Sequence, residues 1–423
     1  SRRLESGAQP KNVDVRRSLE RLLGKKAEPL LEDLEAQRLS NLPTYVFDIV
    51  DKHKTEERAK GKDLIDLSMA SPDLPTPAPV IEAMKKALDD PANHRYPNFN
   101  GLQEFREGVR DWCLKQYNFH VDADKEIIPL IGSKEGLIHL ALAFVNQGDS
   151  VLVPIPAYPA HFRGALIAGG TPVVLPTSEK TGYLPNLSII DEAIANKAKI
   201  LFLSFPTNPT GAVSTKEFFE DAVAFCKKYN LILVHDFAYA EIYFDGNKPI
   251  SIMEIPGAKD TSLEFHTFSK TFSMAGWRAG FVVGNHELIE SLRKMKTNLD
   301  YGLFMATQKA CIAAMKLPKS YFEELRSIYQ KRRDALISGL KSLGWEIENP
   351  KASMYVWARV PKDFSSSNFA LDLLQKTGVA VSPGIGFGDL GEGYIRFALI
   401  DSVVRINEGI VRMRKAGIKY NNG

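Results

Sequence analysis

The stretch that decides the fold spans residues 269–278 and reads Ser-Lys-Thr-Phe-Ser-Met-Ala-Gly-Trp-Arg. It follows a mostly apolar run at 263–268 that has the length of a buried strand. Lys270 therefore lies between a predicted core strand and a small, aromatic segment that we expect to be buried. Burial lowers the pKa of an amine, and the neutral amine can attack an aldehyde. Arg278, at the end of the same stretch, carries a planar cation suited to a phosphate.

Outward from this stretch, short apolar runs alternate with segments of helical periodicity. The predicted strands lie at 151–155, 199–205, 231–235, 263–268 and 281–284. Such runs indicate strands covered on both faces, and their alternation with helices predicts a mostly parallel sheet. Val80 and Met84 have helical spacing in a first helix, and Ser214 with Glu217 predicts a capping box at the start of a later one.

Length and texture predict more than one domain. At 423 residues the chain is longer than a single hydrophobic core usually grows, so we expect two packed domains. After about residue 316, long polar-faced helices with apolar runs at 354–357 and 395–399 predict a smaller α+β lobe. Residues 1–40 are polar and rich in charge, and we expect them to form a peripheral arm or linker without chemistry.

Charge and cysteine content exclude several classes of protein. The net charge is +3 without a clustered basic stretch, which disfavours nucleic acid as a partner. Cys113, Cys226 and Cys311 are widely spaced in apolar helical patterns, so we interpret them as buried thiols in a reducing compartment and expect no metal site. No apolar run approaches the roughly 20 residues of a membrane span, and no charged-then-apolar leader precedes the fold. We therefore expect a cytoplasmic protein that acts on small molecules.

Polar residues at the ends of predicted strands supply the other parts of a site. Asp236 ends the strand at 231–235, and Tyr239 follows it. Asn208 lies in the turn-rich segment 205–211, and the Gly-Ser-Lys-Glu-Gly turn at 132–136 can offer backbone amides to a phosphate at a helix N-terminus. Arg396 lies in an otherwise apolar strand, where an unpaired guanidinium is costly, so it needs a partner.

In this order the motifs resemble the class I and II aminotransferases, which are fold type I enzymes dependent on pyridoxal 5'-phosphate (PLP). The resemblance covers residues from about 40 to 415. It implies an α/β fold, with a large domain whose mostly parallel seven-stranded sheet is sandwiched by helices, and a smaller α+β domain. It assigns 41–75 to the N-terminal part of the small domain, 76–315 to the large PLP-binding domain and 316–423 to the C-terminal part of the small domain.

The resemblance also implies a role for each motif residue. Lys270 holds PLP as a Schiff base and moves the substrate's proton, Asp236 pairs with the pyridine nitrogen, and Tyr239 bonds the phenolate oxygen. Arg396 and Asn208 bind the substrate α-carboxylate, Ala70 stands where many relatives have glycine, and Tyr45 is a further substrate-side residue. The implied cofactor-binding set comprises Ser133, Lys134, Tyr158, Asn208, Asp236, Ala238, Tyr239, Thr267, Ser269, Lys270 and Arg278, completed by Tyr96 from the neighbouring subunit of a homodimer with composite active sites.

The substrate is less sharply indicated than the cofactor. Segments 132–137, 350–357, 381–388 and 395–400 resemble the bacterial glutamate-pyruvate (alanine) aminotransferases, so we expect alanine or glutamate with pyruvate or 2-oxoglutarate. No motif places a second arginine for a side-chain carboxylate, which disfavours a strict dicarboxylate specialist. The alternatives are an LL-diaminopimelate or aspartate aminotransferase, an aminotransferase domain of a biosynthetic pathway with an unusual substrate, and a PLP-dependent lyase. A non-enzymatic regulator would need a DNA-binding domain, for which residues 1–40 are too short.

Overall fold

The computed structural model describes residues 36–43 and 46–420. The chain divides into two compact units, Ser1–Pro43 and Thr44–Gly423. In the first unit the described residues form one short helix, α2 (Gln37–Ser40), and the expected arm at 1–40 falls mostly outside the described residues. Neither described range contains a helix that is both long and apolar enough to cross a membrane. All the elements described below belong to the second unit.

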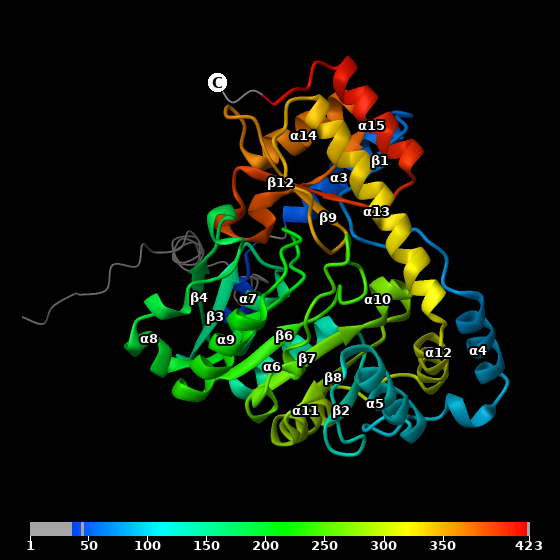
Figure 1. Ribbon diagram of the computed structural model, residues 1–423, viewed down its shortest axis with the longest axis vertical. Coiled ribbons are helices and arrows are strands. Elements are labelled where there is room, and N and C mark those ends of the chain that lie inside the picture. Colours follow the sequence, from blue (N-terminus) through cyan, green and yellow to red (C-terminus); the bar gives the residue numbers. More distant parts are fainter. Residues whose placement is uncertain (1–35, 44–45, 421–423) are drawn as a thin grey trace, which may run out of the picture. The chain divides into compact units, whose positions relative to one another are not determined.

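A seven-stranded sheet forms the centre of the larger part of this unit (Figure 1). The strands lie in the order β2-β8-β7-β6-β5-β3-β4, and β8 alone runs antiparallel to its neighbours. This confirms the predicted mostly parallel sheet. Their bounds are β2 Ile127–Leu130, β3 Ser150–Ile155, β4 Thr171–Pro176, β5 Ala198–Leu203, β6 Ile232–Asp236, β7 Ser262–Thr267 and β8 Gly280–Gly284.

Helices cover both faces of this sheet. Because successive strand residues point to opposite faces, Ile200 and Phe202 of β5 pack into a core cluster with α6, α7 and α11, while Leu201 and Leu203 pack into a second cluster with α5, α9 and α12. The helices are α4 (Ala78–Leu88), α5 (Gln103–Tyr117), α6 (Ser133–Phe144), α7 (Ala160–Ala168), α8 (Glu192–Lys197), α9 (Lys216–Tyr229), α10 (Phe268–Thr271), α11 (His286–Leu299) and α12 (Met305–Met315). The α/β class follows from this arrangement, in which helices pack on both faces of the sheet.

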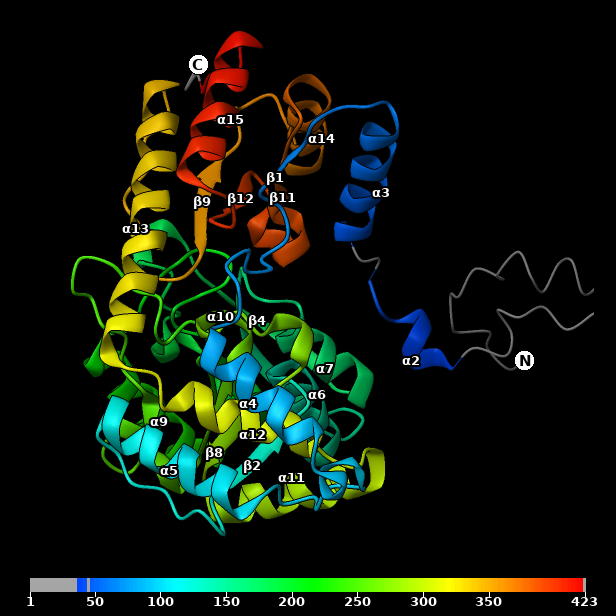
Figure 2. The same ribbon diagram turned by 90° about the vertical axis from the view of Figure 1, so that its right-hand side faces the viewer.

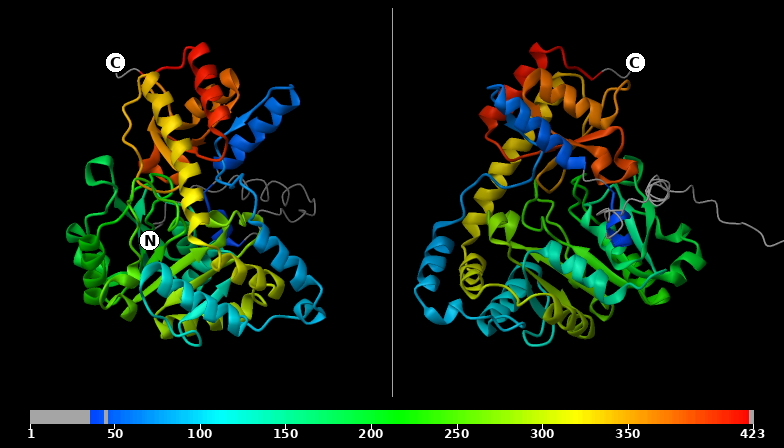
Figure 3. Two further views of the ribbon diagram at one scale, coloured as in Figure 1. Left: turned by 45° about the vertical axis from the view of Figure 1, so that its right-hand side comes forward. Right: turned by 180° about the vertical axis from the view of Figure 1, so that it is seen from behind.

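A third apolar cluster surrounds two smaller sheets. One is antiparallel, in the order β11-β12-β9, and the other pairs β1 with β10 in parallel. Long α13 runs from beside α12 to the flank of β9 and α15 (Figures 1 and 2), and α3, blue in Figure 3, packs beside α14 and β11. These elements are α3 (Val46–Ala59), β1 (Ile65–Asp66), α13 (Lys319–Ser342), β9 (Tyr355–Arg359), α14 (Ser366–Thr377), β10 (Val379–Ala380), β11 (Ser382–Pro383), β12 (Tyr394–Ala398) and α15 (Val403–Lys415).

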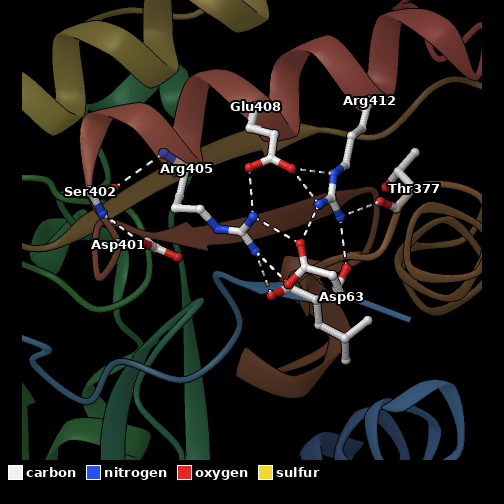
Figure 4. A network of polar contacts seen from close by, with 8 residues as sticks. Asp63, Thr377, Asp401, Ser402, Arg405, Glu408 and Arg412 are labelled. Atoms are coloured by element: carbon white, nitrogen blue, oxygen red, sulfur yellow. Dashed lines mark hydrogen bonds and ion pairs between the residues drawn. The ribbon is translucent and has the colours of Figure 1, made fainter. Parts of the chain in front are cut away.

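The segment that precedes β1 is tied to α15 by charged side chains (Figure 4). Both carboxylate oxygens of Asp63 accept hydrogen bonds from Arg405 at 2.9 Å, and Oδ2 accepts another from Arg412 at 2.5 Å. Glu408 bridges the two arginines. Each exposed ion pair contributes little to stability. Together they fix where the chain enters β1, which leads directly to residues that line the candidate site.

The predicted strands differ from the observed ones by at most two residues at either end. The capping box predicted from Ser214 and Glu217 is wrong. The N-cap of α9 is Thr215, whose hydroxyl accepts a hydrogen bond from the Phe218 amide at 3.2 Å, while the Ser214 hydroxyl donates to the Thr215 carbonyl. Ser214 and Thr215 both carry a hydroxyl that could cap the helix, and in the structure Thr215 is the cap. The domain boundaries at 75 and 315 stay a prediction.

Candidate active site

A cavity of about 270 Å³ lies beside the carboxyl ends of β5, β6 and β7. In open α/β sheets this edge is where ligands bind, because the turns that leave the strands converge there. Thirteen of the predicted site residues line this one cavity: Ala70, Ser133, Lys134, Tyr158, Asn208, Asp236, Ala238, Tyr239, Thr267, Ser269, Lys270, Arg278 and Arg396. The structure therefore brings together residues that lie far apart in the sequence.

Lys270 reaches the cavity from the short helix α10, which begins directly after β7. Its Nζ donates a hydrogen bond to the backbone carbonyl of Ala70. Burial, helped by the positive charges of Arg396 and Arg278, lowers the pKa of Lys270 from 10.5 to about 8. A substantial fraction of this amine is therefore neutral near physiological pH, the form that attacks an aldehyde or removes a proton.

Asp236 lines the cavity and has one carboxylate oxygen without a hydrogen-bond partner in the described part of the chain. It ends β6 and is 4% exposed. Its Oδ2 lies 2.9 Å from Nε2 of His161 on α7, whereas Oδ1 has no hydrogen-bond partner among the described residues. A buried carboxylate oxygen without a partner is costly, so this atom needs a donor from a bound molecule.

A cup for an anion forms around the start of α6. The first amides of this helix, at Ser133 and Lys134, have no acceptor within the helix, and both residues line the cavity. Gly132, at φ +80°, lets the guanidinium of Arg278 approach, because a Cβ there would lie 2.3 Å from Nη2. At the end of β7, the Thr267 hydroxyl donates to Ser269 Oγ at 2.9 Å and accepts from the Ser269 amide.

Arg396 enters the cavity from β12 and is 6% exposed. It donates to Asn208 Oδ1 at 2.8 Å and to the Ser68 carbonyl at 2.6 Å, while its Nε lacks a partner in the described part of the chain. Its guanidinium lies over the rings of Tyr355 and Phe387. No carboxylate of the described residues pairs with Arg396, so no structural salt bridge neutralises its charge in this part of the molecule.

Two predicted residues remain. Tyr96 is 79% exposed, packs against Tyr301 with the two rings tilted, and does not line the cavity of its own chain. Tyr45 lies outside the described residues.

Two further residues contact the predicted site residues without having been predicted from the sequence, His161 and Tyr355. Tyr355 forms a 2.5 Å hydroxyl pair with Tyr239, and burial raises the pKa of Tyr239 well above its ordinary value. The signal for His161 was its position three residues after Tyr158 in an otherwise apolar helix start.

Comparison with known families defines the class. The family model described as aminotransferase class I and II matches residues 62–404. This chain belongs to the class I and II aminotransferases, and it is an enzyme dependent on PLP. The site fits this cofactor: the free Oδ1 of Asp236 suits a protonated ring nitrogen, the cup at α6 suits a phosphate, and Lys270 suits an aldehyde.

Individual relatives resemble this chain over most of its length. The LL-diaminopimelate aminotransferase of Halothermothrix orenii is 44% identical over 385 residues, which cover 91% of this chain and 99% of that relative. The corresponding enzyme of Maridesulfovibrio salexigens is 46% identical over 381 residues, covering 90% of this chain and 98% of its own. Among solved structures, substrate-bound BacF from Bacillus subtilis is 36% identical with a TM-score of 0.88, covering 92% of this chain and 99% of its own.

Proposed function

We propose that this enzyme takes an amino group from LL-diaminopimelate and passes it to a 2-oxo acid. The observation that carries the amino-acid part is the buried guanidinium of Arg396, which shares a cavity with Lys270 and meets no carboxylate of the described residues. What supports the particular donor is the similarity to LL-diaminopimelate aminotransferases over 91% of the chain. The expected likeness to alanine aminotransferases is not confirmed, and the comparisons favour this alternative.

Each half of the reaction uses the same side chains. When bound, PLP supplies an aldehyde for covalent attachment and a protonated pyridine ring that withdraws electrons from the substrate α-carbon. Asp236 would hold the ring nitrogen through Oδ1, and the amides of Ser133 and Lys134 with Arg278 would hold the phosphate. Arg396 and Asn208 orient the substrate carboxylate, and the neutral amine of Lys270 removes the α-proton. Because one site serves donor and acceptor in turn, we expect ping-pong kinetics.

The charges in the cavity suit the far end of this donor. LL-diaminopimelate carries a second carboxylate and a second ammonium at its distal end. The described cavity wall also includes Lys134, whose side-chain ammonium has no role so far, and Asp51, whose carboxylate pairs with Lys54. The arginines among its described lining residues are Arg278 and Arg396, which the proposal assigns to the phosphate and to the α-carboxylate. A donor with both charges at its distal end therefore fits better than a simple dicarboxylate.

A substrate panel tests the proposal. The cofactor-loaded enzyme is mixed with 2-oxoglutarate and LL-diaminopimelate, meso-diaminopimelate, L-alanine or L-aspartate, and glutamate is quantified with time. We expect kcat/KM for LL-diaminopimelate to exceed that for L-alanine by about tenfold or more, since a distal ion pair contributes roughly 1–3 kcal/mol. Meso-diaminopimelate, which differs at one stereocentre, is the matched control. Faster turnover of alanine would restore the alanine assignment, and ammonia release without glutamate would indicate a lyase.

Assembly and location belong to the same proposal. Tyr96 and Tyr301 are 79% and 59% exposed and form an aromatic surface group with Phe99. Exposed aromatic clusters commonly mark interfaces. We place this group against a second copy of the chain, with Tyr96 reaching the partner's phosphate cup. The three cysteines are free and buried, which supports a reducing compartment such as the cytoplasm.

A further inference from the structure

Lys54 on α3 is a buried cation that the proposed reaction does not yet use. The residue is 4% exposed. Its Nζ lies 2.5 Å from Asp51 Oδ1, 2.9 Å from Asp66 Oδ2 and 3.0 Å from Ser68 Oγ. An ammonium has three protons to donate, and these three acceptors satisfy all of them. Because burying an ammonium is costly unless it is fully paired, this side chain is held in one position.

The hydrogen bonds continue from Lys54 to the substrate-binding arginine. Ser68 Oγ accepts from Lys54 and donates to Asp66 Oδ1 at 2.5 Å, and the Ser68 amide donates to the same oxygen at 3.1 Å. The Ser68 carbonyl accepts from Arg396 Nη2 at 2.6 Å. Ser382 contacts both groups, because its hydroxyl donates to the Ser68 carbonyl at 2.6 Å and accepts from Arg396 at 3.1 Å. One residue, Ser68, therefore separates Lys54 from Arg396.

The same segment also reaches the catalytic lysine and the cavity wall. Two residues after Ser68, the carbonyl of Ala70 accepts the hydrogen bond from Lys270. On α3 itself, Phe47, Val50 and Asp51 line the cavity. Lys54 thus joins the helix that forms one wall to the backbone that contacts both Arg396 and Lys270.

We propose that Lys54 is a positioning residue for substrate carboxylates. It holds Ser68 so that the Ser68 carbonyl, together with Asn208 Oδ1 and Ser382 Oγ, fixes the plane of the Arg396 guanidinium, whose Nε has no partner in the described part of the chain. Two-pronged recognition of a carboxylate depends on that plane. The inference rests on the proposed role of Arg396. It predicts an effect on every substrate that carries an α-carboxylate, donor and acceptor alike.

The test compares Lys54→Met with Lys52→Met, which removes an exposed lysine from the same helix. For each variant, KM and kcat are measured for the best amino donor of the substrate panel and for 2-oxoglutarate. Misplacement of the guanidinium should raise both KM values about tenfold or more in Lys54→Met while kcat falls less. Lys52→Met should match the wild type. A loss confined to kcat, as a smaller active fraction would give, overturns the proposal, and so does a Lys54→Met enzyme with unchanged KM values.

Two further variants keep the test decisive. Ser68→Ala cuts the link to Lys54 but leaves the ion pair between Lys54 and Asp66, so it should raise both KM values even if Lys54→Met fails to fold. If Ser68→Ala leaves them unchanged, the proposal is wrong. Arg396→Lys tests whether Arg396 binds the substrate α-carboxylate, and it should raise KM for donor and acceptor. Unchanged KM values would refute both that role and this inference. The proposed donor is tested separately, by the turnover of LL-diaminopimelate in the wild type, which does not depend on the result with these variants.

Discussion

At the scale of single residues, the central feature is an amine whose protonation is set by its surroundings. Burial is the largest influence on Lys270, and the charges of Arg396 and Arg278 act in the same direction, bringing its pKa to about 8. The amine is protonated below this pH and neutral above it. Reactivity that needs the neutral amine should therefore rise with pH and reach half its maximum near pH 8, well below the value for an exposed lysine.

Competitive labelling of the cofactor-free enzyme measures this directly. A small amine-reactive reagent is applied at trace level across pH 6–11, a range chosen to bracket both pKa values, and the peptides are quantified by mass spectrometry. The labelling of Lys270 should titrate near pH 8 and that of exposed lysines near pH 10. Titration of Lys270 together with the exposed lysines would show that the cavity does not depress its pKa.

Asp236 is the second residue with a testable role. Its Oδ1 is buried and free, and His161 fixes Oδ2. Asp236→Asn keeps the shape but removes the negative charge that would keep a ring nitrogen protonated. We expect kcat to fall by about 10²–10³-fold or more, while PLP binding measured by absorbance is partly retained. Turnover close to that of the wild type would refute this assignment.

At the scale of elements, the anion cup depends on a close approach between the turn before α6 and Arg278. Gly132→Ala would place a Cβ 2.3 Å from Nη2 of Arg278 in a backbone conformation at φ +80°. Gly61→Ala is the matched control, since Gly61 has φ +78° and nothing within 4 Å. We expect Gly132→Ala to weaken PLP binding about tenfold or more, measured by titration of the cofactor-free enzyme, and Gly61→Ala to leave it unchanged. Equal effects would attribute the loss to backbone strain alone.

The elements also show how far the sequence could be followed. Strands buried on both faces appear as continuous apolar runs, so five of the seven strands of the large sheet were located to within two residues, and the motifs at their ends were found with them. The strands β2 and β4 were not predicted. His161 and Tyr355 were missed because their importance comes from pairing with Asp236 and Tyr239, which lie far away in the sequence. The network around Lys54 could not be predicted for a different reason, because an amphipathic helix with charged residues has the pattern of an ordinary surface helix.

At the scale of the whole molecule, the composite active site is the feature to test. Tyr96 cannot serve its own cavity, since it is 79% exposed and does not line it. We expect a homodimer by light scattering. Mixing Tyr96→Ser with Lys270→Ala under conditions that exchange subunits should restore activity, because each mixed dimer contains one intact site with Lys270 from one chain and Tyr96 from the other. A fully active monomer, or no recovery on mixing, would contradict the shared site.

We expect one lysine of this chain to hold PLP, and the attachment site can be mapped chemically. The cofactor-loaded enzyme is treated with borohydride, which reduces the bond between the cofactor and the protein to a stable one, and the digested protein is mapped by mass spectrometry. We expect the added mass on Lys270, whereas Lys134, the other lysine that lines the cavity in the described chain, should be unmodified. Modification of Lys134 or of an exposed lysine, with Lys270 unmodified, would contradict it.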